Sequence, residues 1–366
     1  MMSKKIRVAI LYGGKSGEHE VSLMSAHSIM RHIDTERFDA VPIGIDKNGD
    51  WNLNDPKAIF SEDRRELLIK TANSRPISIP DSSLPIDVVF PVLHGPLGED
   101  GCVQGVFECS NLAYVGAGVL GSALAMDKSM AKTVIQAAGI LIPRFITAFD
   151  YFPRAQLGDF YKEITRQLGD LIFVKPARLG SSVGISRVTN REQFIAAFEL
   201  AAHLDSKIII EEGVKARELE LSVLDHPHYG QPPLVSIAGE IIPSEKHQFY
   251  SYDAKYVDAD GAQLIAPADL TPEQLQACQA VARDAYRALD CEGMARVDLF
   301  MEHGTGRILL NEINTIPGFT SISMYPRLWE ASGLGYSNLI SCLIDLAMAR
   351  HQRRQQLITD YQMIRL

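Results

Sequence analysis

Four polar side chains near the end of the chain have the types and the spacing to bind a cation. Arg296 and Asp298 lie in one short apolar run, Glu312 and Asn314 lie in the next, and the linking residues 302–306 contain two glycines. This pattern predicts the two strands of a β-hairpin. Side chains two positions apart on a strand share a face, so each run presents its two polar groups together.

The expected register of this hairpin brings all four groups to one face. With the turn centred on Gly304, residue 296 opposes residue 312, and residue 298 opposes residue 310. Two carboxylates and an amide oxygen form a hard oxygen site that suits Mg²⁺. Magnesium normally accompanies nucleotide phosphates. An arginine–carboxylate salt-bridge network inside a sheet is the other interpretation, and the pattern alone leaves both open.

The segment 175–184 is a candidate phosphate-binding loop. Its small residues, among them Ser181 and Ser182, let backbone N–H groups approach an anion closely. Lys175, on the preceding apolar run, supplies a point charge for phosphate. The loop joins two expected strands, so an ordinary hairpin is the alternative. Gly14-Lys15-Ser16 is not a P-loop, because position 9 is alanine where that motif requires glycine.

Three further charged or titratable side chains stand at the ends of expected elements. Glu18 follows an apolar run at 6–12 and a Gly-Gly turn, and His94 follows a run at 86–93. In an open α/β sheet the carboxyl ends of the strands border the ligand crevice, so both could face a ligand. Glu18 could instead complement a helix dipole, and His94 could cap a turn. Lys128 opens a helix, where a cation is mildly unfavourable, which hints at function.

The surrounding elements predict two kinds of sheet. Apolar runs alternate with helical periodicity in the N-terminal part, which predicts an open, doubly wound parallel sheet, and the segments after 213 favour antiparallel strands. Residues 61–85 are expected to form a helix and a loop, residues 244–266 a long functional loop, and one last helix follows the hairpin. The first helix is expected to turn Val21, Met24, Ile29, Met30 and Ile33 towards the core. The other expected elements are helices at 127–138, 191–203 and 271–289 and strands at 40–45, 171–176, 184–188, 207–211 and 218–224.

Composition excludes several classes of protein. The 366 residues are 46% hydrophobic and 22% charged, which is ordinary for a globular chain and excludes dominant disorder. The net charge of −9 disfavours nucleic acid as a partner, and no apolar run is long enough to span a membrane. Five cysteines without a C-x-x-C pair predict neither a zinc ribbon nor a disulfide framework. With no signal-peptide core, we expect a cytoplasmic protein.

Taken in order, these motifs resemble those of the D-alanine–D-alanine ligases of the ATP-grasp superfamily. The resemblance covers nearly the whole chain and rests on the segments 13–22, 94–101, 126–128, 174–184, 252–256, 295–298 and 311–320. It implies an N-terminal open α/β substrate domain followed by a two-domain ATP-grasp fold. The implied bounds are 1–121 for the first domain, 122–213 for a central lid domain and 214–366 for a C-terminal catalytic domain that carries the mobile loop 244–266.

The activity that the resemblance implies is ATP-dependent ligation of two D-alanines for peptidoglycan synthesis. The carboxylate of one D-alanine attacks the γ-phosphate of ATP to give an acyl phosphate. The amine of the second D-alanine then attacks that carbonyl, and phosphate leaves. The implied ligands are ATP, two Mg²⁺ or Mn²⁺ ions and two D-alanines, and the implied assembly is a homodimer, with no nucleic acid or membrane as a partner.

The resemblance also implies roles for the substrate-binding residues. Glu18 would bind the ammonium of the first D-alanine, and Ser181 and Tyr256 resemble the pair that links Glu18 to the closed loop. Arg296 would stabilise charge on the tetrahedral oxyanion and on the transferring phosphoryl group. Ser323 would hold the carboxylate of the second D-alanine. His94 matches a family histidine that acts either as a base or as an electrostatic helper.

On the nucleotide side, the implied roles concern phosphates, metal and adenine. Asp298, Glu312 and Asn314 would hold two metal ions that bridge the β- and γ-phosphates. The implied ATP contacts are Lys128 and Lys175 for the α- and β-phosphates, Lys255 for the γ-phosphate, Ser182 in the phosphate loop, Glu211 and Val214 for adenine, Glu218 for ribose and Phe249 over the adenine face. Met324 stands where leucine is usual, a volume-conserving difference that should matter little. Glu212-Gly213 departs from the commonest pattern at the hinge, which leaves the adenine pocket less defined.

Three rival functions share part of this pattern. Another ATP-grasp carboxylate–amine ligase would keep the phosphate and metal residues, so Glu18, Tyr256 and Ser323 discriminate against it. A D-alanyl-D-lactate ligase is disfavoured by Tyr256. A non-catalytic nucleotide-binding regulator is disfavoured because the lysines and the metal-binding residues are all present.

Overall fold

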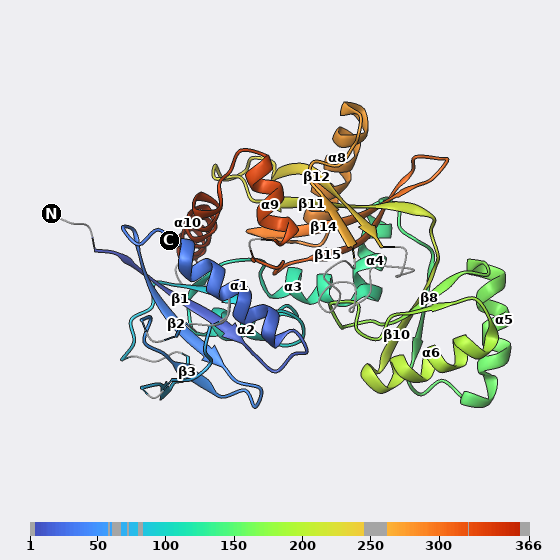
Figure 1. Cartoon of the computed structure of the whole chain (residues 1–366), viewed down its shortest axis with the longest axis horizontal. Helices are drawn as coiled ribbons and strands as arrows, with labels where there is room; N and C mark the ends of the chain where they lie inside the picture. The colour runs from blue at the N-terminus through green and yellow to red at the C-terminus, as the bar shows by residue number, and fades with distance from the viewer. Residues whose placement is uncertain are drawn as a thin grey trace.

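The structure is a computed structural model that describes residues 4–57, 59–60, 67–71, 73–79, 83–244, 262–320 and 322–358. In this part of the chain three β-sheets follow one another in sequence order. Figure 1 shows the first sheet with α1 on the left, the second sheet with α5 and α6 on the right, and the third sheet above and between them. The predicted site residues come from segments that pack against or belong to all three sheets.

The first sheet has the predicted open parallel core. Its strand order is β4-β3-β2-β1-β5-β6, in which β2, β1, β5 and β6 are parallel, β3 pairs antiparallel with β2, and the edge strand β4 pairs antiparallel with β3. Helices α1 and α10 pack on one face and α2 on the other, as a doubly wound sheet requires. The bounds are β1 Ile6–Gly13, β2 Phe38–Ile45, β3 Trp51–Leu53, β4 Arg75–Pro76, β5 Val88–Val92, β6 Ala113–Tyr114, α1 His19–His32, α2 Cys102–Cys109 and α10 Tyr336–Gln355.

The buried face of α1 differs from the predicted one. Ile29 and Ile33 are buried as expected, but Val21 and Met24 are only half-buried and line a cavity instead. The helix buries three serines, Ser22, Ser25 and Ser28, which pure apolar periodicity passes over. Their hydroxyls form hydrogen bonds with groups of other elements, which offsets the cost of burying them.

The second sheet is a small antiparallel layer that carries the candidate phosphate loop. Its order is β7-β10-β8-β9, and α5 and α6 cover it with a core rich in phenylalanine. Strands β8 and β9 pair as a hairpin, so the segment between them projects from the sheet. The bounds are β7 Phe145–Phe149, β8 Ile172–Pro176, β9 Ser186–Val188, β10 Lys207–Glu212, α5 Leu157–Leu168 and α6 Arg191–Leu204.

The third sheet is antiparallel, as expected, with the order β13-β12-β11-β14-β15. Helix α8 packs on it together with α3 and α4, and its first turn has a full capping box between Thr271 and Gln274. Two helices, α9 and α10, follow the hairpin in the described chain, where one was predicted. The bounds are β11 Ala216–Leu224, β12 Leu234–Pro243, β13 Ala262–Ile265, β14 Met294–Glu302, β15 Ile308–Asn314, α3 Val119–Met126, α4 Lys128–Ala137, α8 Pro272–Ala288 and α9 Met324–Ala331.

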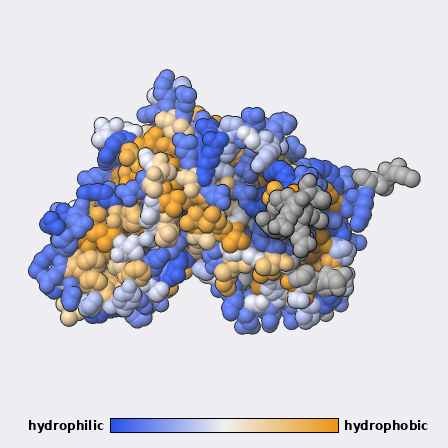
Figure 2. Space-filling view, turned by 180° about the vertical axis from the view of Figure 1, so that it is seen from behind, coloured by the Kyte–Doolittle hydropathy of each residue, from blue (hydrophilic) through white to orange (hydrophobic). Residues whose placement is uncertain are grey.

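The division of the chain into three domains stays a prediction. Gly121, where we expected the first domain to end, lies in α3, and α10 returns from the C-terminal part to the first sheet. Figure 2, a view from behind, shows the surface notched between the lobe of the first sheet and the lobe of the second.

Of residues 61–85, the described ones form the short strand β4 and a bridge from Leu67 to Phe60, with no helix. Among the described helices, none has the length and apolar character to cross a membrane.

Candidate active site

Most of the predicted substrate and metal residues meet in one cavity of about 490 Å³. Its walls come from α1, the loop after β5, the β8–β9 loop, strands β11, β14 and β15, and the segment 316–324. The site residues predicted from the sequence that line it are Glu18, His94, Ser181, Arg296, Glu312, Asn314 and Ser323. The tertiary structure therefore joins segments that are about 300 positions apart in the chain.

The β14–β15 hairpin forms, but with a different register from the predicted one. Arg296 pairs with Asn314, and Asp298 pairs with Glu312. The register shifts between Asp298 and Leu299, because a β-bulge there inserts an extra residue that no count from the turn can foresee. All four polar groups still share one face, since each position moved by two residues.

Arg296 is held by two carboxylates. Its Nε and Nη2 donate to Asp298 at 2.7 and 2.6 Å, and its Nε lies 3.2 Å from Glu220. Burial opposes the charge of Arg296, but these carboxylates raise its pKa well above the ordinary value. The salt-bridge network considered as an alternative is thus present. It fixes the guanidinium as a permanent cation at the wall of the cavity.

The predicted metal-binding residues have donor chemistry that fits a hard divalent cation. Asp298 and Glu312 offer carboxylates on paired strands, and Asn314 offers an amide whose Nδ2 now donates to Asp298 at 3.2 Å. Glu312 faces Lys128 at 3.7 Å. No group of three histidine, cysteine or acidic side chains suited to a metal occurs in the described residues, so two carboxylates and an amide are the set available.

The β8–β9 loop reaches the start of α1. The Ser181 hydroxyl donates a hydrogen bond to the Glu18 carboxylate, and both side chains line the cavity. Ser181 and Ser182 adopt left-handed backbone conformations with φ of 51° and 59°. At Gly180 a Cβ would lie 2.7 Å from a carboxylate oxygen of Glu18, so a larger residue would have to displace that carboxylate. The small residues that suggested phosphate binding therefore also bring the loop to Glu18.

His94 is buried, and both of its ring nitrogens have partners. Nδ1 lies 2.9 Å from the carbonyl oxygen of Ile316, and Nε2 lies 3.3 Å from the Ser25 hydroxyl. A carbonyl can only accept, so Nδ1 carries the hydrogen and Nε2 accepts from Ser25. Burial lowers the pKa of His94, although Glu18 opposes that shift. The imidazole is therefore neutral, and both of its nitrogens are hydrogen-bonded to other protein groups.

Glu99 is a cavity residue that sequence reasoning did not single out. Its carboxyl accepts from the backbone N–H groups of Gly95 at 2.7 Å and Ile316 at 3.2 Å. Burial, assisted by the nearby carboxylate of Glu18, raises the pKa of Glu99 to about 8. The signal available was its position in the quoted segment 94–101, five residues after His94.

A lysine–glutamate cluster marks the predicted nucleotide side. Glu211 accepts from Lys175 Nζ at 2.7 Å and lies 3.2 Å from Lys132 Nζ, which also donates to the carbonyl oxygen of Asn311 at 3.4 Å. Burial would raise the pKa of Glu211, but the two lysines outweigh it and lower the pKa to about 2. Lys132 was not predicted; its spacing of four from Lys128 on one helix was the available signal.

The remaining predicted residues surround this cluster or lie outside the described chain. Glu218 on β11 is close enough to raise the pKa of Lys175, and Val214 is half-buried between β10 and β11. Glu212 turns outward and pairs with Arg144 at 2.6 Å, so this departure from the family pattern is on the far side of β10. Phe249, Lys255 and Tyr256, with most of the loop 244–266, fall outside the described residues.

Ser323 lies near the end of the segment 316–324, which forms one wall of the cavity. It precedes α9, its Oγ accepts from Thr320 N at 3.1 Å, and a Cβ at Gly318 would lie 2.9 Å from that Oγ. Met324 is buried behind it and packs close to Gly239, which agrees with a purely packing role for the leucine-to-methionine difference. The segment therefore presents a hydroxyl and backbone groups to the cavity.

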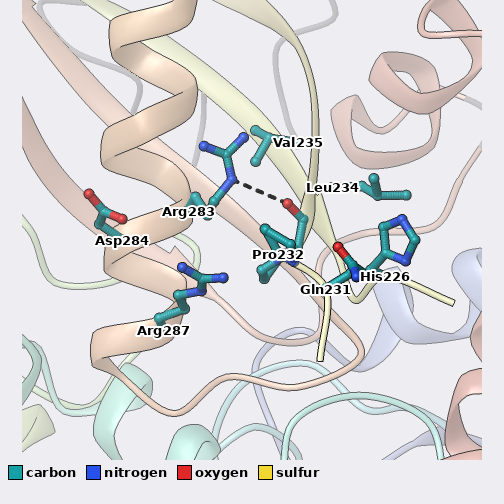
Figure 3. Close-up of a pocket in the computed structure, with 9 residues that line it drawn as sticks. His226, Gln231, Pro232, Leu234, Val235, Arg283, Asp284 and Arg287 are labelled. Atoms are coloured by element: carbon teal, nitrogen blue, oxygen red, sulfur yellow. Dashed lines mark hydrogen bonds between the residues drawn. The ribbon is translucent and has the colours of Figure 1, made fainter. Parts of the chain in front are cut away.

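A second hollow of about 620 Å³ lies elsewhere on the surface. Figure 3 shows Arg283, Asp284 and Arg287 of α8 on one side of it and the segment 231–235 on the other. Arg283 Nε donates to the carbonyl oxygen of Pro233 at 3.3 Å. None of the predicted site residues that the structure describes lines this hollow. The predicted site residues therefore gather in the smaller cavity and not in this hollow.

Comparisons with known proteins agree with this arrangement. Residues 7–117 match the family model described as D-ala D-ala ligase N-terminus, and residues 134–345 match D-ala D-ala ligase C-terminus. The chain is 46% identical to a D-alanine–D-alanine ligase of Shouchella clausii (97% of this chain, 98% of the relative) and 44% identical to D-alanine–D-alanine ligase A of Escherichia coli K12 (95% and 97%).

Solved structures give the same result. The D-alanine-D-alanine ligase of Coxiella burnetii superposes with a TM-score of 0.85 at 36% identity, over 99% of both chains. The VanG D-Ala:D-Ser ligase of Enterococcus faecalis superposes with a TM-score of 0.80 at 35% identity, over 94% of this chain and 100% of the other. The likeness thus extends through all three sheets.

Proposed function

We propose how the cavity residues divide their work from the premise that this chain belongs to the D-alanine–D-alanine ligase family. The chain catalyses the ATP-dependent ligation of two D-alanines to D-alanyl-D-alanine, a step of peptidoglycan precursor synthesis, with release of ADP and phosphate. The observation that carries the assignment of roles is that one cavity holds the Glu18 carboxylate, the Arg296 cation and the Glu312–Asn314 oxygens together.

The first D-alanine binds with its ammonium on Glu18 in this proposal. The Glu18 carboxylate lies at the start of α1, and Ser181 donates to it, which leaves further lone pairs for a substrate cation. The same contact holds the β8–β9 loop against α1. Binding of the substrate would therefore be coupled to placement of the phosphate loop over the site, where water must be excluded from an acyl phosphate.

The negative charge of both reaction steps develops near Arg296. Because Asp298 and Glu220 hold the guanidinium, it needs little reorganisation when charge forms on the phosphoryl oxygens or on the tetrahedral oxyanion. Asp298, Glu312 and Asn314 would hold two Mg²⁺ ions, which supply neutralisation of the β- and γ-phosphate charge. Lys128 lies beside Glu312 and adds a further cation.

ATP would extend from this point towards the Lys175–Glu211 cluster. Lys175 and Lys128 bind phosphate oxygens, Ser182 lies in the phosphate loop, and Glu218 meets the ribose. The Glu211 carboxylate is already paired with two lysines. We therefore assign recognition of the adenine base to backbone groups between Glu211 and Val214. The second D-alanine places its carboxylate on the Ser323 hydroxyl and the backbone near Gly318.

The test is phosphate release from ATP with single amino acids as substrates. D-alanine is expected to release phosphate with one D-alanyl-D-alanine formed per phosphate, and L-alanine is expected to release none above background. D-serine and D-lactate, each added beside D-alanine, report the range of acceptors. Absence of dipeptide with D-alanine, or equal turnover with L-alanine, would overturn the assignment.

Three further features belong to the same proposal. We place the reaction in the cytoplasm because it consumes ATP, we expect a homodimer on the basis of the family resemblance, and we keep the domain bounds 1–121, 122–213 and 214–366. Light scattering of the purified enzyme decides between one and two chains. Titration with Mg²⁺ and with Mn²⁺ at fixed ATP decides the identity and number of the ions.

A further inference from the structure

The segment that follows the metal-binding asparagine is held by the N-terminal sheet through its backbone. Both backbone polar groups of Ile316 are hydrogen-bonded. Its N–H donates to Glu99 at 3.2 Å, and its carbonyl oxygen accepts from His94 at 2.9 Å. Phe319 N–H donates to the Ser25 hydroxyl at 3.2 Å, and Ser25 also faces His94 Nε2 at 3.3 Å. Three side chains of α1 and of the segment after β5 therefore hold the loop that follows β15.

These three side chains are buried and mutually fixed. Ser25 is fully buried, and His94 and Glu99 are less than a tenth exposed. His94 joins the other two, because it contacts Ser25 directly and shares Ile316 with Glu99. A buried network in which each polar group has a partner is rigid, and losing one member leaves another unsatisfied.

The geometry of α1 gives this clamp a use in the reaction. Glu18, proposed to hold the first D-alanine, directly precedes α1, and Ser25 lies two turns further along the same helix. The clamped loop leads from Asn314 to Gly318 and Ser323, proposed to hold the second D-alanine. One helix thus fixes the spacing between the group that holds the donor and the loop that holds the acceptor.

We propose that Ser25, His94 and Glu99 are positioning residues that set the acceptor subsite at the distance from the donor which amine attack requires. The inference rests on the function proposed above. Reacting atoms must approach to about 3–3.5 Å, and a misplacement of 1 Å can cost about a hundredfold in rate. His94 acts in this clamp through its ring nitrogens and not as the base, because both nitrogens are engaged with the protein.

Ser25→Ala is the direct test, with Ser22→Ala as the matched control. Both serines are fully buried on α1, but Ser22 bonds to Gly13 N–H and to the carbonyl of Val92, inside the first sheet. A loosened acceptor loop should raise the KM of the second D-alanine about tenfold and that of the first less than about twofold. The acyl phosphate should also meet water more often, so the ratio of phosphate to dipeptide should rise above one.

Glu99 provides a second variant in case Ser25→Ala folds poorly. Glu99→Gln keeps an acceptor oxygen for one of the two amides, whereas Glu99→Ala keeps none, so the KM of the second D-alanine should rise further in the alanine variant. Circular dichroism and the thermal midpoint establish that each variant is folded. General destabilisation of the fold is not expected to raise the KM of the second D-alanine alone, or to raise it more in Glu99→Ala than in Glu99→Gln.

The outcomes separate this inference from the function on which it rests. If the wild-type enzyme makes no dipeptide, the proposed function fails. If the wild type is active but Ser25→Ala and Ser22→Ala change both D-alanine KM values equally, with a phosphate-to-dipeptide ratio of one, the clamp is overturned and the function stands.

Discussion

Two buried glutamates at opposite ends of the site have opposite electrostatic behaviour. Glu211 and Glu99 are 3% and 8% exposed, and burial by itself raises the pKa of each carboxyl. Glu211 has two lysines beside it, and its pKa falls to about 2. Glu99 has backbone amides and the carboxylate of Glu18, and its pKa rises to about 8. The neighbours, not the degree of burial, decide the charge.

The contrast extends to the two halves of the site. On the nucleotide side, Lys132 and Lys175 are both paired with Glu211, so two cations share one carboxylate and the cluster keeps an excess of positive charge that suits a phosphate. On the amino-acid side, Glu18 and Glu99 stand close together in the cavity. In the function proposed above, the ammonium of the first D-alanine is the cation that binds on this side. The nucleotide half therefore has an excess of cations suited to an anionic ligand, and the amino-acid half has neighbouring carboxyl groups suited to a cationic one.

The largest effect is expected where the two halves meet, at Glu312. Glu312→Gln keeps the shape of the side chain but removes a charge from a site that faces Lys128 and the cavity. We expect phosphoryl transfer to fall about a hundredfold or more, as for the loss of a key electrostatic stabiliser. ADP release at saturating Mg²⁺ measures it.

The control for this variant is Glu302→Gln, at the turn of the same hairpin, where the carboxylate pairs with Arg307 at 2.8 Å. Its turnover should match that of the wild type. If Glu312→Gln also turns over normally, Glu312 does not belong to the metal-binding set and the two halves do not meet there.

Lys132→Met breaks the pairing on the nucleotide side. We expect a loss of about 2 kcal/mol in the free energy of unfolding, less than the 3–5 kcal/mol for a fully broken buried pair, because Lys175 remains on Glu211. Urea denaturation monitored by circular dichroism measures it. Lys162→Met, which removes an exposed lysine paired with Asp159, should change little. Equal effects of the two substitutions would show that Glu211 does not depend on Lys132.

Glu99→Gln tests the contrast between Glu99 and Glu211 through the pH dependence of the free energy of unfolding. The folded-state pKa of Glu99, about 8, lies above its ordinary value of 4.5, so its contribution is fully present below pH 4.5 and is lost as the pH rises to about 8. Over that window it lowers the free energy of unfolding by up to about 1.4 kcal/mol per pH unit. The variant should lack this slope, and denaturation curves at pH 5, 6.5 and 8 report it.

Glu211 should behave with the opposite sign, because its contribution is present above pH 4.5 and is lost only as the pH falls towards 2. Between pH 5 and 8 it therefore adds no slope. Parallel stability curves for the wild type and Glu99→Gln across this range would mean that Glu99 is ionised like Glu211, and the contrast between them would disappear.

The smallest effect is expected at Glu212, which follows Glu211 on the same strand. It points outward to Arg144, whose side chain is 62% exposed, so Glu212→Gln should cost less than about 1 kcal/mol in the free energy of unfolding. Its KM for ATP should equal that of the wild type. A raised KM for ATP would place Glu212, and not only its neighbour, in the adenine pocket.

Local patterns in the sequence determined much of this protein. The alternation in 294–300 and 308–314 predicted the hairpin and the shared face of its polar residues, and the small residues of 175–184 predicted a loop between two strands. The motifs in their order identified the family. Such patterns succeed because side-chain alternation, helical periodicity and glycine conformations depend on a few neighbouring residues.

The tertiary structure alone decided what those segments meet. The hairpin register differs by two residues from the predicted one, and the bulge beside Asp298 accounts for one of them and the turn for the other. Val21 and Met24 line a cavity because the loop that follows β15 faces that side of α1. Lys132 and Glu99 escaped prediction because their partners, Glu211 and Ile316, lie 79 and 217 positions further along the chain. Periodicity shows which side of an element is apolar, but only the packing of distant segments decides whether a buried carboxyl meets lysines or another carboxylate.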